Sequence, residues 1–253
     1  MLKEKIEDNI VIATFEDGQT NPLDLETIRS LDKTVKKVNE DDNLKGLILT
    51  GAGRSFSSGF NLPMFLSFKD LNEVVNFFEE EEEILTNLFM CKKPVISAIN
   101  GHAIAGGMIF SMASDYRIVK NHPKIKIGMS EIKIGLGLSI AQTEVMRFGL
   151  DSDKKFRDVL YFSKMYGVEE AKEKELVDEI VEEDQLIARA KQVISQWIDN
   201  PGRAFITLKY SLKKPIEERI KNYLKTEDWQ SPLNCFFDPG TRKTLEAVQA
   251  MMK

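Results

Sequence analysis

The stretch that decides the fold is residues 97–119, SAINGHAIAGGMIFSMASDYRIV. It begins as a short apolar strand, breaks at Gly101, Gly106 and Gly107, and then becomes apolar again with helical spacing. This pattern predicts a buried strand, a tight turn and a helix whose first residues carry no side chains. The first N–H groups of a helix have no acceptor within it, so such a start leaves backbone donors open to a ligand. Close packing of the helix against the strand is an equally good reason for the glycines.

The residues on both sides of this stretch alternate between strand-like and helix-like patterns. A hairpin is expected around Glu7-Asp8-Asn9. The other expected elements are helices over 21–42 and 67–93, strands over 44–51, 94–100, 115–119 and 124–128, and mostly helices after Leu138, apart from a strand within 176–181. This order predicts an α/β core with right-handed crossovers over residues 1–195 and a helical region over residues 196–253.

Length, composition and charge exclude several classes of protein. The chain has 253 residues and 42% hydrophobic content, enough for one large domain or a domain with a helical annex. A net charge of −5 argues against a broad surface for nucleic-acid phosphates, so we expect no nucleic-acid partner. The apolar runs are far shorter than the roughly 20 residues of a membrane-spanning helix. Residues 1–20 lack the apolar centre of a signal peptide, so we expect a cytoplasmic protein with no membrane partner.

Cysteines and acidic residues give no sign of a metal site. Cys91 and Cys235 are far apart, with no CxxC pair and no nearby histidine cluster, and we interpret both as reduced thiols. The acidic run Glu79–Glu83 is more typical of the solvated face of a long helix than of a metal or partner site.

A second glycine-rich segment, GAGRSFSSGFNL at residues 51–62, directly follows the strand expected at residues 44–50. Loops at the carboxyl ends of such strands are where α/β sheets bind ligands, although an ordinary surface connection fits the composition as well. The turn at Ile104–Gly107 follows a different strand. Two turns with open amides can converge on one oxygen atom, as an oxyanion hole requires.

Glu131 is an isolated acid in the largely apolar segment IGMSEIKIGLGLSI. Apolar surroundings raise the pKa of a carboxyl, which suits proton transfer near neutral pH. The alternative is a turn carboxylate paired with Lys133 or Arg117. His102 is interpreted as a loop residue rather than a catalytic base, because no serine or cysteine nucleophile with supporting partners is near it.

Three segments together resemble the crotonase (enoyl-CoA hydratase/isomerase) superfamily: GRSFSSGFNL, KPVISAINGHAIAGGMIFSMASDYRI and IGMSEIKIGL. The likeness covers nearly the whole chain, with the three segments in the family's order. It implies a spiral of ββα units and assembly as a homotrimer or a dimer of trimers. It also implies a C-terminal helical region that covers the acyl pocket or a neighbour's coenzyme A, with Phe236, Phe237 and the lysines near Lys243 as candidates.

The resemblance also implies roles for individual residues. The N–H groups of Phe60 and Gly106 would hold the thioester oxygen of a coenzyme A substrate, and Glu131 would move the proton. Substrate and coenzyme A contacts are implied for Ser58, Phe60, Asn61, Leu62, Gly107 and Ile109. The partner is then an acyl-CoA molecule, with no metal and no permanently bound cofactor.

The choice of reaction depends on a missing acid. Hydratases of the family use a second glutamate on the helix after the glycine pair, and counting back from Asp115 places that position at Ile109. One carboxylate and an oxyanion hole are enough to shift a double bond from C3 to C2, the reaction of Δ3-Δ2 enoyl-CoA isomerases. The alternatives are a hydratase or hydrolase of alicyclic or aromatic acyl-CoA and a non-catalytic scaffold that binds CoA esters. Phe60-Asn61 and the absence of proline in GLGLSI depart from common family patterns and leave the acyl chain open.

Overall fold

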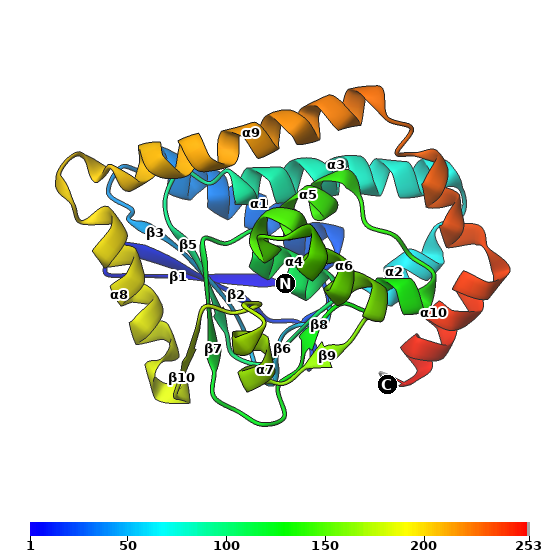
Figure 1. The fold of residues 1–253 in the computed structure, drawn as a ribbon, viewed down its shortest axis with the longest axis horizontal. Helices are drawn as coiled ribbons and strands as arrows, with labels where there is room; N and C mark the ends of the chain where they lie inside the picture. The colour runs from blue at the N-terminus through cyan, green and yellow to red at the C-terminus, as the bar shows by residue number, and fades with distance from the viewer. Residues whose placement is uncertain (252–253) are drawn as a thin grey trace.

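The computed structural model describes residues 1–251, which form two sheets surrounded by helices (Figure 1). The strands of the larger sheet, in spatial order, are β1 (Leu2–Glu7), β2 (Ile10–Phe15), β3 (Gly46–Gly51), β5 (Val95–Ile99), β7 (Tyr116–Lys120) and β10 (Glu179–Val181). Those of the smaller sheet are β4 (Ser55–Ser57), β6 (His102–Ile104), β8 (Ile127–Gly128) and β9 (Met165–Tyr166). Pairs β1–β2 and β8–β9 are antiparallel, and the other pairs are parallel. The predicted α/β class is confirmed, as is the opening hairpin.

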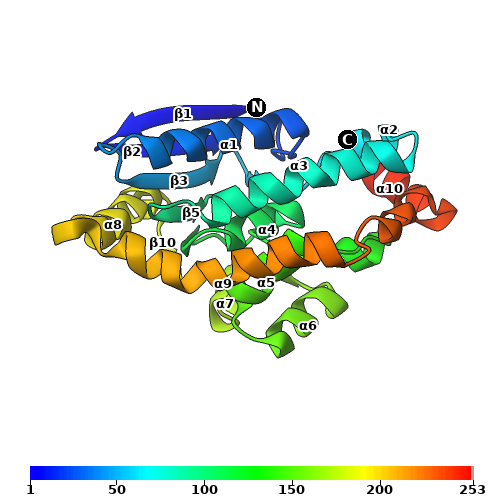
Figure 2. The same ribbon diagram turned by 90° about the horizontal axis from the view of Figure 1, so that it is seen from above.

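The helices account for most of the remaining chain. They are α1 (Leu25–Glu40), α2 (Leu62–Ser67), α3 (Leu71–Phe89), α4 (Gly106–Met112), α5 (Ile140–Leu150), α6 (Asp153–Phe162), α7 (Val168–Glu173), α8 (Leu186–Ile198), α9 (Phe205–Thr226) and α10 (Pro239–Met251). Short 3₁₀ turns are η1 (Glu131–Ile134), η2 (Glu183–Gln185), η3 (Pro201–Arg203) and η4 (Ser231–Phe237). Helix α9 spans the molecule on the outside, and α10 lies against α2 at the far end (Figures 1 and 2). The predicted boundary between residues 195 and 196 lies within α8, which ends at Ile198 before η3.

The inner strands of the larger sheet, β2, β3, β5 and β7, are buried on both faces, which explains their nearly continuous apolar sequences, whereas the edge strand β1 is mostly exposed. Alternate residues of β3 point to opposite faces. Leu47 and Leu49 belong to the core under α1 and α3, whereas Ile48 belongs to the core under α8. All three side chains are fully buried, so the sheet is a rigid base for the loops that follow its strands.

The glycine-rich segments contain more regular structure than the sequence predicts. Residues 55–57 form β4 and residues 102–104 form β6, where loops are expected, and the strand expected over 124–128 is reduced to Ile127–Gly128. Strands this short carry too few residues to show a period of two. Their pairing builds the smaller sheet, and the loops beyond its strands build the candidate site.

The prediction of a solvated face for the whole acidic run Glu79–Glu83 is wrong. Glu79 and Glu83 are exposed, but Glu81 is 0% and Glu82 is 1% exposed. The two buried side chains lie on the side of α3 that meets the N-terminus of α5, where unpaired backbone N–H groups need acceptors. Glu82 accepts two of these N–H groups, and Glu81 contacts the Ser139 hydroxyl at the same helix end.

Two further findings concern absences. Among residues 1–251, no helix is both long and apolar enough to span a membrane. Cys91 and Cys235 are free thiols, as expected, the first buried and the second half-buried.

Candidate active site

The two glycine-rich turns meet at one edge of the smaller sheet. Strands β4 and β6 are parallel neighbours, so the residues that follow them emerge side by side. A Cβ atom on Gly59 would lie 2.8 Å from the Cβ of Ala105 and 2.9 Å from the nitrogen of Gly106. Gly59 also has a φ of +95°, which disfavours any side chain there. Glycine at this position therefore allows the two backbone segments to touch.

The backbone N–H groups of Phe60 and Gly106 are both unused. The N–H of Leu23 donates to Gly59 O over 2.8 Å, and the N–H of Asn61 donates to Leu23 O over 2.9 Å. In such a parallel bridge, the N–H of the middle residue, Phe60, points away from Leu23. Gly106 is the first residue of α4, so its N–H has no acceptor in the helix. Within residues 1–251 neither group donates a hydrogen bond, and two adjacent free donors have the arrangement of an oxyanion hole.

Ala105 holds the second turn in an unusual conformation. Its φ of 56° and ψ of −127° lie outside the regions that an alanine ordinarily adopts, at a cost of about 1–3 kcal/mol. The N–H of Ala105 donates to Gly128 O of β8 over 2.9 Å, which fixes the turn to the sheet. The neighbouring N–H of Gly106 is therefore oriented before any ligand arrives.

Glu131 begins η1, immediately beyond β8 at the same edge of the sheet. Its Oε2 accepts a hydrogen bond from the N–H of Ser130 over 2.8 Å. Burial raises the pKa of Glu131 to about 7. The alternative pairing with Lys133 or Arg117 is not formed, because Lys133 donates to Ser163 O and Arg117 pairs with Asp178. No cation among the described residues pairs with the Glu131 carboxyl.

A cavity of about 260 Å³ joins the two turns to Glu131. Its walls are Ser58, Phe60, Leu62, Phe65, Phe78, Ile104, Ala105, Ser130, Glu131, Ile134, Leu136, Gly137, Gln142, Phe236 and Val248. Phe236, from η4, closes one side, with its ring 5.0 Å from that of Phe65 and 5.7 Å from that of Phe78. Glu131 is the one ionisable side chain among these wall residues. The space is thus an apolar chamber with a single carboxyl and two backbone donors at its edge.

Four sequence-predicted residues are absent from the cavity wall: Asn61, Gly106, Gly107 and Ile109. Asn61 accepts from the N–H of Met64 over 3.0 Å and caps α2. Gly107 packs so closely on Ser57 O that any Cβ would overlap it. Ile109 is fully buried and is not a wall residue. These three positions support the site through packing and capping.

The Phe60 ring lies closer to Gly106 than the sequence suggests. A Cβ on it would lie 3.2 Å from two ring carbons of Phe60, so a side chain there would press on that ring.

Several wall residues escaped sequence reasoning. Gln142 belongs to α5, where it forms a capping box with Ser139, and Val248 comes from α10. The sequence shows the capping box, but this motif predicts only the start of a helix and not a place in the cavity wall. Phe237 is not among the wall residues and has the Arg242 guanidinium over its ring, and Lys243 is exposed.

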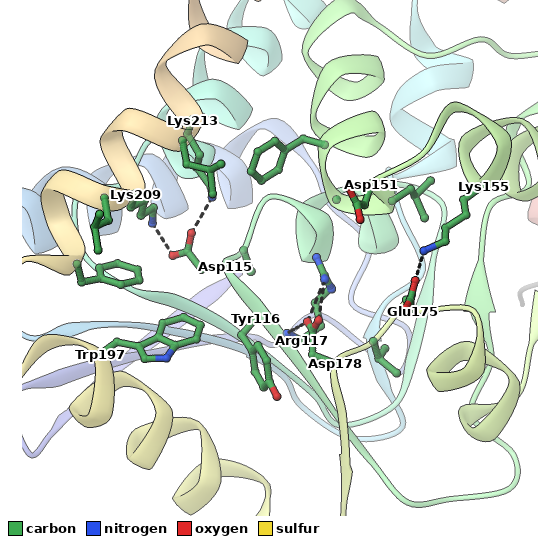
Figure 3. A pocket seen from close by; sticks show the side chains of 18 of the residues that line it. Asp115, Tyr116, Arg117, Asp151, Lys155, Glu175, Asp178, Trp197, Lys209 and Lys213 are labelled. Atoms are coloured by element: carbon green, nitrogen blue, oxygen red, sulfur yellow. Dashed lines mark hydrogen bonds and ion pairs between the residues drawn. The ribbon is translucent and has the colours of Figure 1, made fainter.

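A larger hollow of about 640 Å³ lies elsewhere, among β7, the end of α5, and helices α8 and α9 (Figure 3). Asp115 is held there between Lys209 at 2.5 Å and Lys213 at 2.8 Å. Although burial opposes it, the two lysines lower the pKa of Asp115, while burial lowers the pKa of Lys213 to about 8. Figure 3 also shows ion pairs of Arg117 with Asp178 and of Lys155 with Glu175. Because these groups are held in ion pairs, we assign them to structure rather than to chemistry: Lys209 and Lys213 anchor α9 to Asp115, and the other two pairs join β7 and α6 to the segment before β10.

No group of three or more His, Cys, Asp or Glu side chains within residues 1–251 is arranged to hold a metal ion.

Comparison with known proteins identifies the protein family that the chain matches. The family model described as enoyl-CoA hydratase/isomerase matches residues 5–233. The chain is 26% identical over 223 residues to the rat protein named enoyl-CoA delta isomerase 1, mitochondrial, covering 87% of this chain and 76% of the relative. It is 25% identical over 245 residues to the human protein of the same name, covering 96% and 80%.

Solved structures share the fold. Human mitochondrial delta3-delta2-enoyl-CoA isomerase superposes with a TM-score of 0.90 at 22% identity, covering 99% of this chain and 97% of that chain. An enoyl-CoA hydratase from Bacillus halodurans superposes with a TM-score of 0.84 at 23% identity, covering 97% and 99%. The expected crotonase-type fold is thereby confirmed. Proteins named for two different reactions share it, so the site residues must distinguish between them.

Proposed function

The chain belongs to the enoyl-CoA hydratase/isomerase family of enzymes, and from this premise we propose that it shifts the double bond of an enoyl-CoA ester from C3 to C2. The observation that carries the proposal is the lone carboxyl of Glu131 in an apolar cavity beside two free backbone donors. The sequence relatives named as isomerases support it.

The oxyanion hole binds the thioester. The N–H groups of Phe60 and Gly106 donate to the thioester oxygen, where negative charge develops when a proton leaves C2. Loss of one such donor typically costs about 10²–10³ in rate. Because both groups belong to backbone held by β4, β6 and Ala105, they need little reorganisation during the reaction.

Glu131 moves the proton. Its carboxylate removes a proton from C2 of the 3-enoyl ester, and the electron pair of that C–H bond delocalises into the thioester and the C3–C4 double bond to give a dienolate. The carboxylic acid then returns the proton to C4, which leaves the double bond between C2 and C3. No atom is gained or lost. A pKa near 7 suits both halves, because the group must accept and release a proton at neutral pH.

The surroundings of Glu131 favour this reaction over hydration. Hydration needs a group that activates water, and no second carboxyl lines the cavity among the described residues. Ile109, where the family's hydratases place their second glutamate, is apolar and fully buried. A hydratase or hydrolase of alicyclic or aromatic acyl-CoA is the competing proposal.

The deciding experiment is to incubate the purified protein with a 3-enoyl-CoA in D₂O and follow the products by mass spectrometry. We expect a 2-enoyl ester with no mass gain from water, and conversion slowed by about 10²–10⁴ in the Glu131→Gln variant. Rapid formation of a 3-hydroxyacyl-CoA would overturn the isomerase proposal in favour of hydration. Release of free coenzyme A would favour a hydrolase.

We also propose that the chain assembles as a homotrimer or a dimer of trimers. Support comes from Leu208 and Leu212 on α9, which are 70% and 64% exposed and line the larger hollow together with Trp197 and Phe205. Burying such side chains between subunits is favourable. Light scattering at several concentrations measures the assembly, and a monomer at all of them would contradict it. The cytoplasmic location stays a prediction, and the rat and human relatives are named as mitochondrial.

A further inference from the structure

A further pocket adjoins the cavity that contains Glu131 and has no part in the chemistry proposed above. We call it the adjoining pocket; its volume is about 360 Å³, and its walls come from α3, α5, η4 and the end of α9. Three of its wall residues, Phe78, Gly137 and Phe236, also line the cavity. These three residues therefore stand between the two spaces and form a partition.

Phe236 is the best-packed member of this partition. Its buried ring lies 5.0 Å from the ring of Phe65 at an angle of 89°, 5.7 Å from that of Phe78 and 6.1 Å from that of Phe68. Edge-to-face contacts at such distances are favourable, so three neighbouring rings hold Phe236 in place. Gly137 adds no side chain to the partition. The separation of the two spaces thus depends on the rings of Phe236 and Phe78.

A row of rings connects the oxyanion hole with the partition. The N–H of Phe60 is one of the two free donors, and its ring lies 5.5 Å from that of Phe65. Phe65 in turn contacts Phe236. An acyl chain that runs along these rings from the thioester therefore ends at Phe236, after two successive ring contacts.

The volume of the cavity limits the chain that fits in it. At roughly 30 Å³ per non-hydrogen atom, the share of one molecule in liquid water, 260 Å³ holds about eight or nine such atoms. The carbonyl carbon, its oxygen and the sulfur of the thioester are three of them. The cavity therefore has room for an acyl chain of about six carbons in all.

The adjoining pocket offers hydrocarbon a suitable surface on the far side of the partition. Leu138, Ile140 and Leu233 supply apolar wall, and the buried acid in its lining, Glu144, is paired with Arg219 over 2.9 Å. Burial of further methylene groups against such a wall is favourable. The ring of Phe236, rather than the chemistry of the adjoining pocket, is what keeps a longer chain out.

We propose that the enzyme acts on short enoyl-CoA esters, with acyl chains of about six carbons or fewer, and that Phe236 sets this limit by closing the cavity against the adjoining pocket. The kinetic form of this inference rests on the proposed function. Phe236 is a specificity-determining residue, because it selects which chains bind and takes no part in the proton transfer by Glu131.

The test compares the parent with Phe236→Ala on 3-hexenoyl-CoA and 3-decenoyl-CoA. In the parent we expect kcat/KM to be at least about tenfold lower for the longer ester, and in Phe236→Ala we expect the ratio of the longer over the shorter to increase by about 10- to 100-fold. The ratio does not depend on the folded fraction, so a partly unstable variant still reports it. Phe237→Ala, outside the wall, is the matched control and should keep the parent's ratio. A parent ratio near one, or an unchanged ratio in Phe236→Ala, would overturn the proposal.

A second pair of variants tests where the longer chain goes. Thr143 of α5 lines the adjoining pocket but not the cavity, so Thr143→Phe places a ring in that pocket alone. We expect the double variant Phe236→Ala/Thr143→Phe to return to the parent's ratio, and Thr143→Phe by itself to leave that ratio unchanged. A double variant that keeps the full gain would place the chain outside the adjoining pocket and overturn this part of the proposal.

Binding gives a readout that does not depend on turnover. By calorimetry, the parent should bind hexanoyl-CoA more tightly than decanoyl-CoA, and Phe236→Ala should bind decanoyl-CoA about tenfold more tightly than the parent does. If the parent shows this preference but isomerises neither 3-enoyl ester, the proposed reaction fails and the limit set by Phe236 stands. If the parent isomerises both esters equally well, the reaction stands and the limit fails.

Discussion

Two hollows of this protein each contain a carboxyl, buried in Asp115 and half-buried in Glu131, and the two carboxyls have opposite electrostatic surroundings. In the larger one, Asp115 lies between two lysines that lower its pKa. In the smaller one, Glu131 has no cation and burial raises its pKa to about 7. A carboxyl paired with cations stays ionised and holds structure together, whereas a carboxyl denied such partners can exchange protons near neutral pH. The lack of an ion pair therefore marks the candidate active site better than the volume of the hollow does.

Removing the acid of the smaller hollow should have the largest effect. The Glu131→Gln substitution keeps the shape and one backbone hydrogen bond but cannot take a proton from C2. We expect kcat to fall by about 10²–10⁴, the usual contribution of a general base. Binding of a saturated acyl-CoA, measured by calorimetry, should change little. Turnover that survives unchanged would remove Glu131 from the mechanism.

Removing the acid of the larger hollow should damage the fold instead. Asp115→Asn leaves Lys209 and Lys213 buried without an anion, and breaking a buried ion pair in this way costs about 3–5 kcal/mol of unfolding free energy. Urea titration measures the loss. Glu175→Gln, at the solvent-exposed ion pair of the same hollow, is the control and should leave the midpoint unchanged. A stable Asp115→Asn protein would show that the lysines find other acceptors.

The raised pKa of Glu131 predicts a pH dependence for both activity and stability. Between pH 4.5 and about 7 the folded chain holds a proton that the unfolded chain releases, so the unfolding free energy falls as the pH rises through this window. Glu131→Gln has no such proton, and should be more stable than the parent by roughly 1–3 kcal/mol at pH 8 and equally stable near pH 4. For the parent, kcat/KM should rise about tenfold per pH unit and level off near pH 7. Urea titrations and rates across this range measure both, and a stability difference independent of pH would contradict the assignment.

The smallest expected effect concerns the wall of the smaller hollow. Phe236→Leu shortens a side chain that packs on Phe65 and Phe78, which enlarges the cavity. We expect the ratio of kcat/KM for 3-decenoyl-CoA over 3-hexenoyl-CoA to increase about tenfold, since a few methylene contacts are worth this much in a binding pocket. Phe237→Leu, outside the wall, should leave the ratio unchanged. An unchanged ratio for both variants would place the acyl chain elsewhere.

Local sequence predicts much of the fold and the centre of the site. The long apolar strands and the amphipathic helix over residues 25–40 follow directly from periodicity, and Glu131 is conspicuous as one acid in an apolar segment. Gln142 and Val248 are not conspicuous, and Phe236 is a candidate only through the family resemblance, because all three reach the cavity from α5, η4 and α10 through tertiary packing. No local sequence pattern predicts that these three elements meet at the cavity.

The wrong prediction of a solvated face for Glu79–Glu83 has a different cause. Val74, Phe77, Phe78, Leu85 and Leu88 are the buried apolar stripe of α3. Continuing that stripe at helical spacing includes positions 81 and 82, so the periodicity places these acids inside. Composition favours a solvated face, and the two signals conflict at Glu81 and Glu82, which accept hydrogen bonds from the start of α5.

Phe236 and Val248 complete the cavity wall, yet they follow every other wall residue in the chain. A growing polypeptide therefore acquires Phe60, Gly106 and Glu131 well before it can enclose an acyl group. Until η4 and α10 are made and α10 docks on α2, the cavity lacks two of its wall residues, so the Glu131 carboxyl is less shielded from water and its pKa is raised less. The cavity around Glu131 is therefore complete only after η4 and α10 have been synthesised.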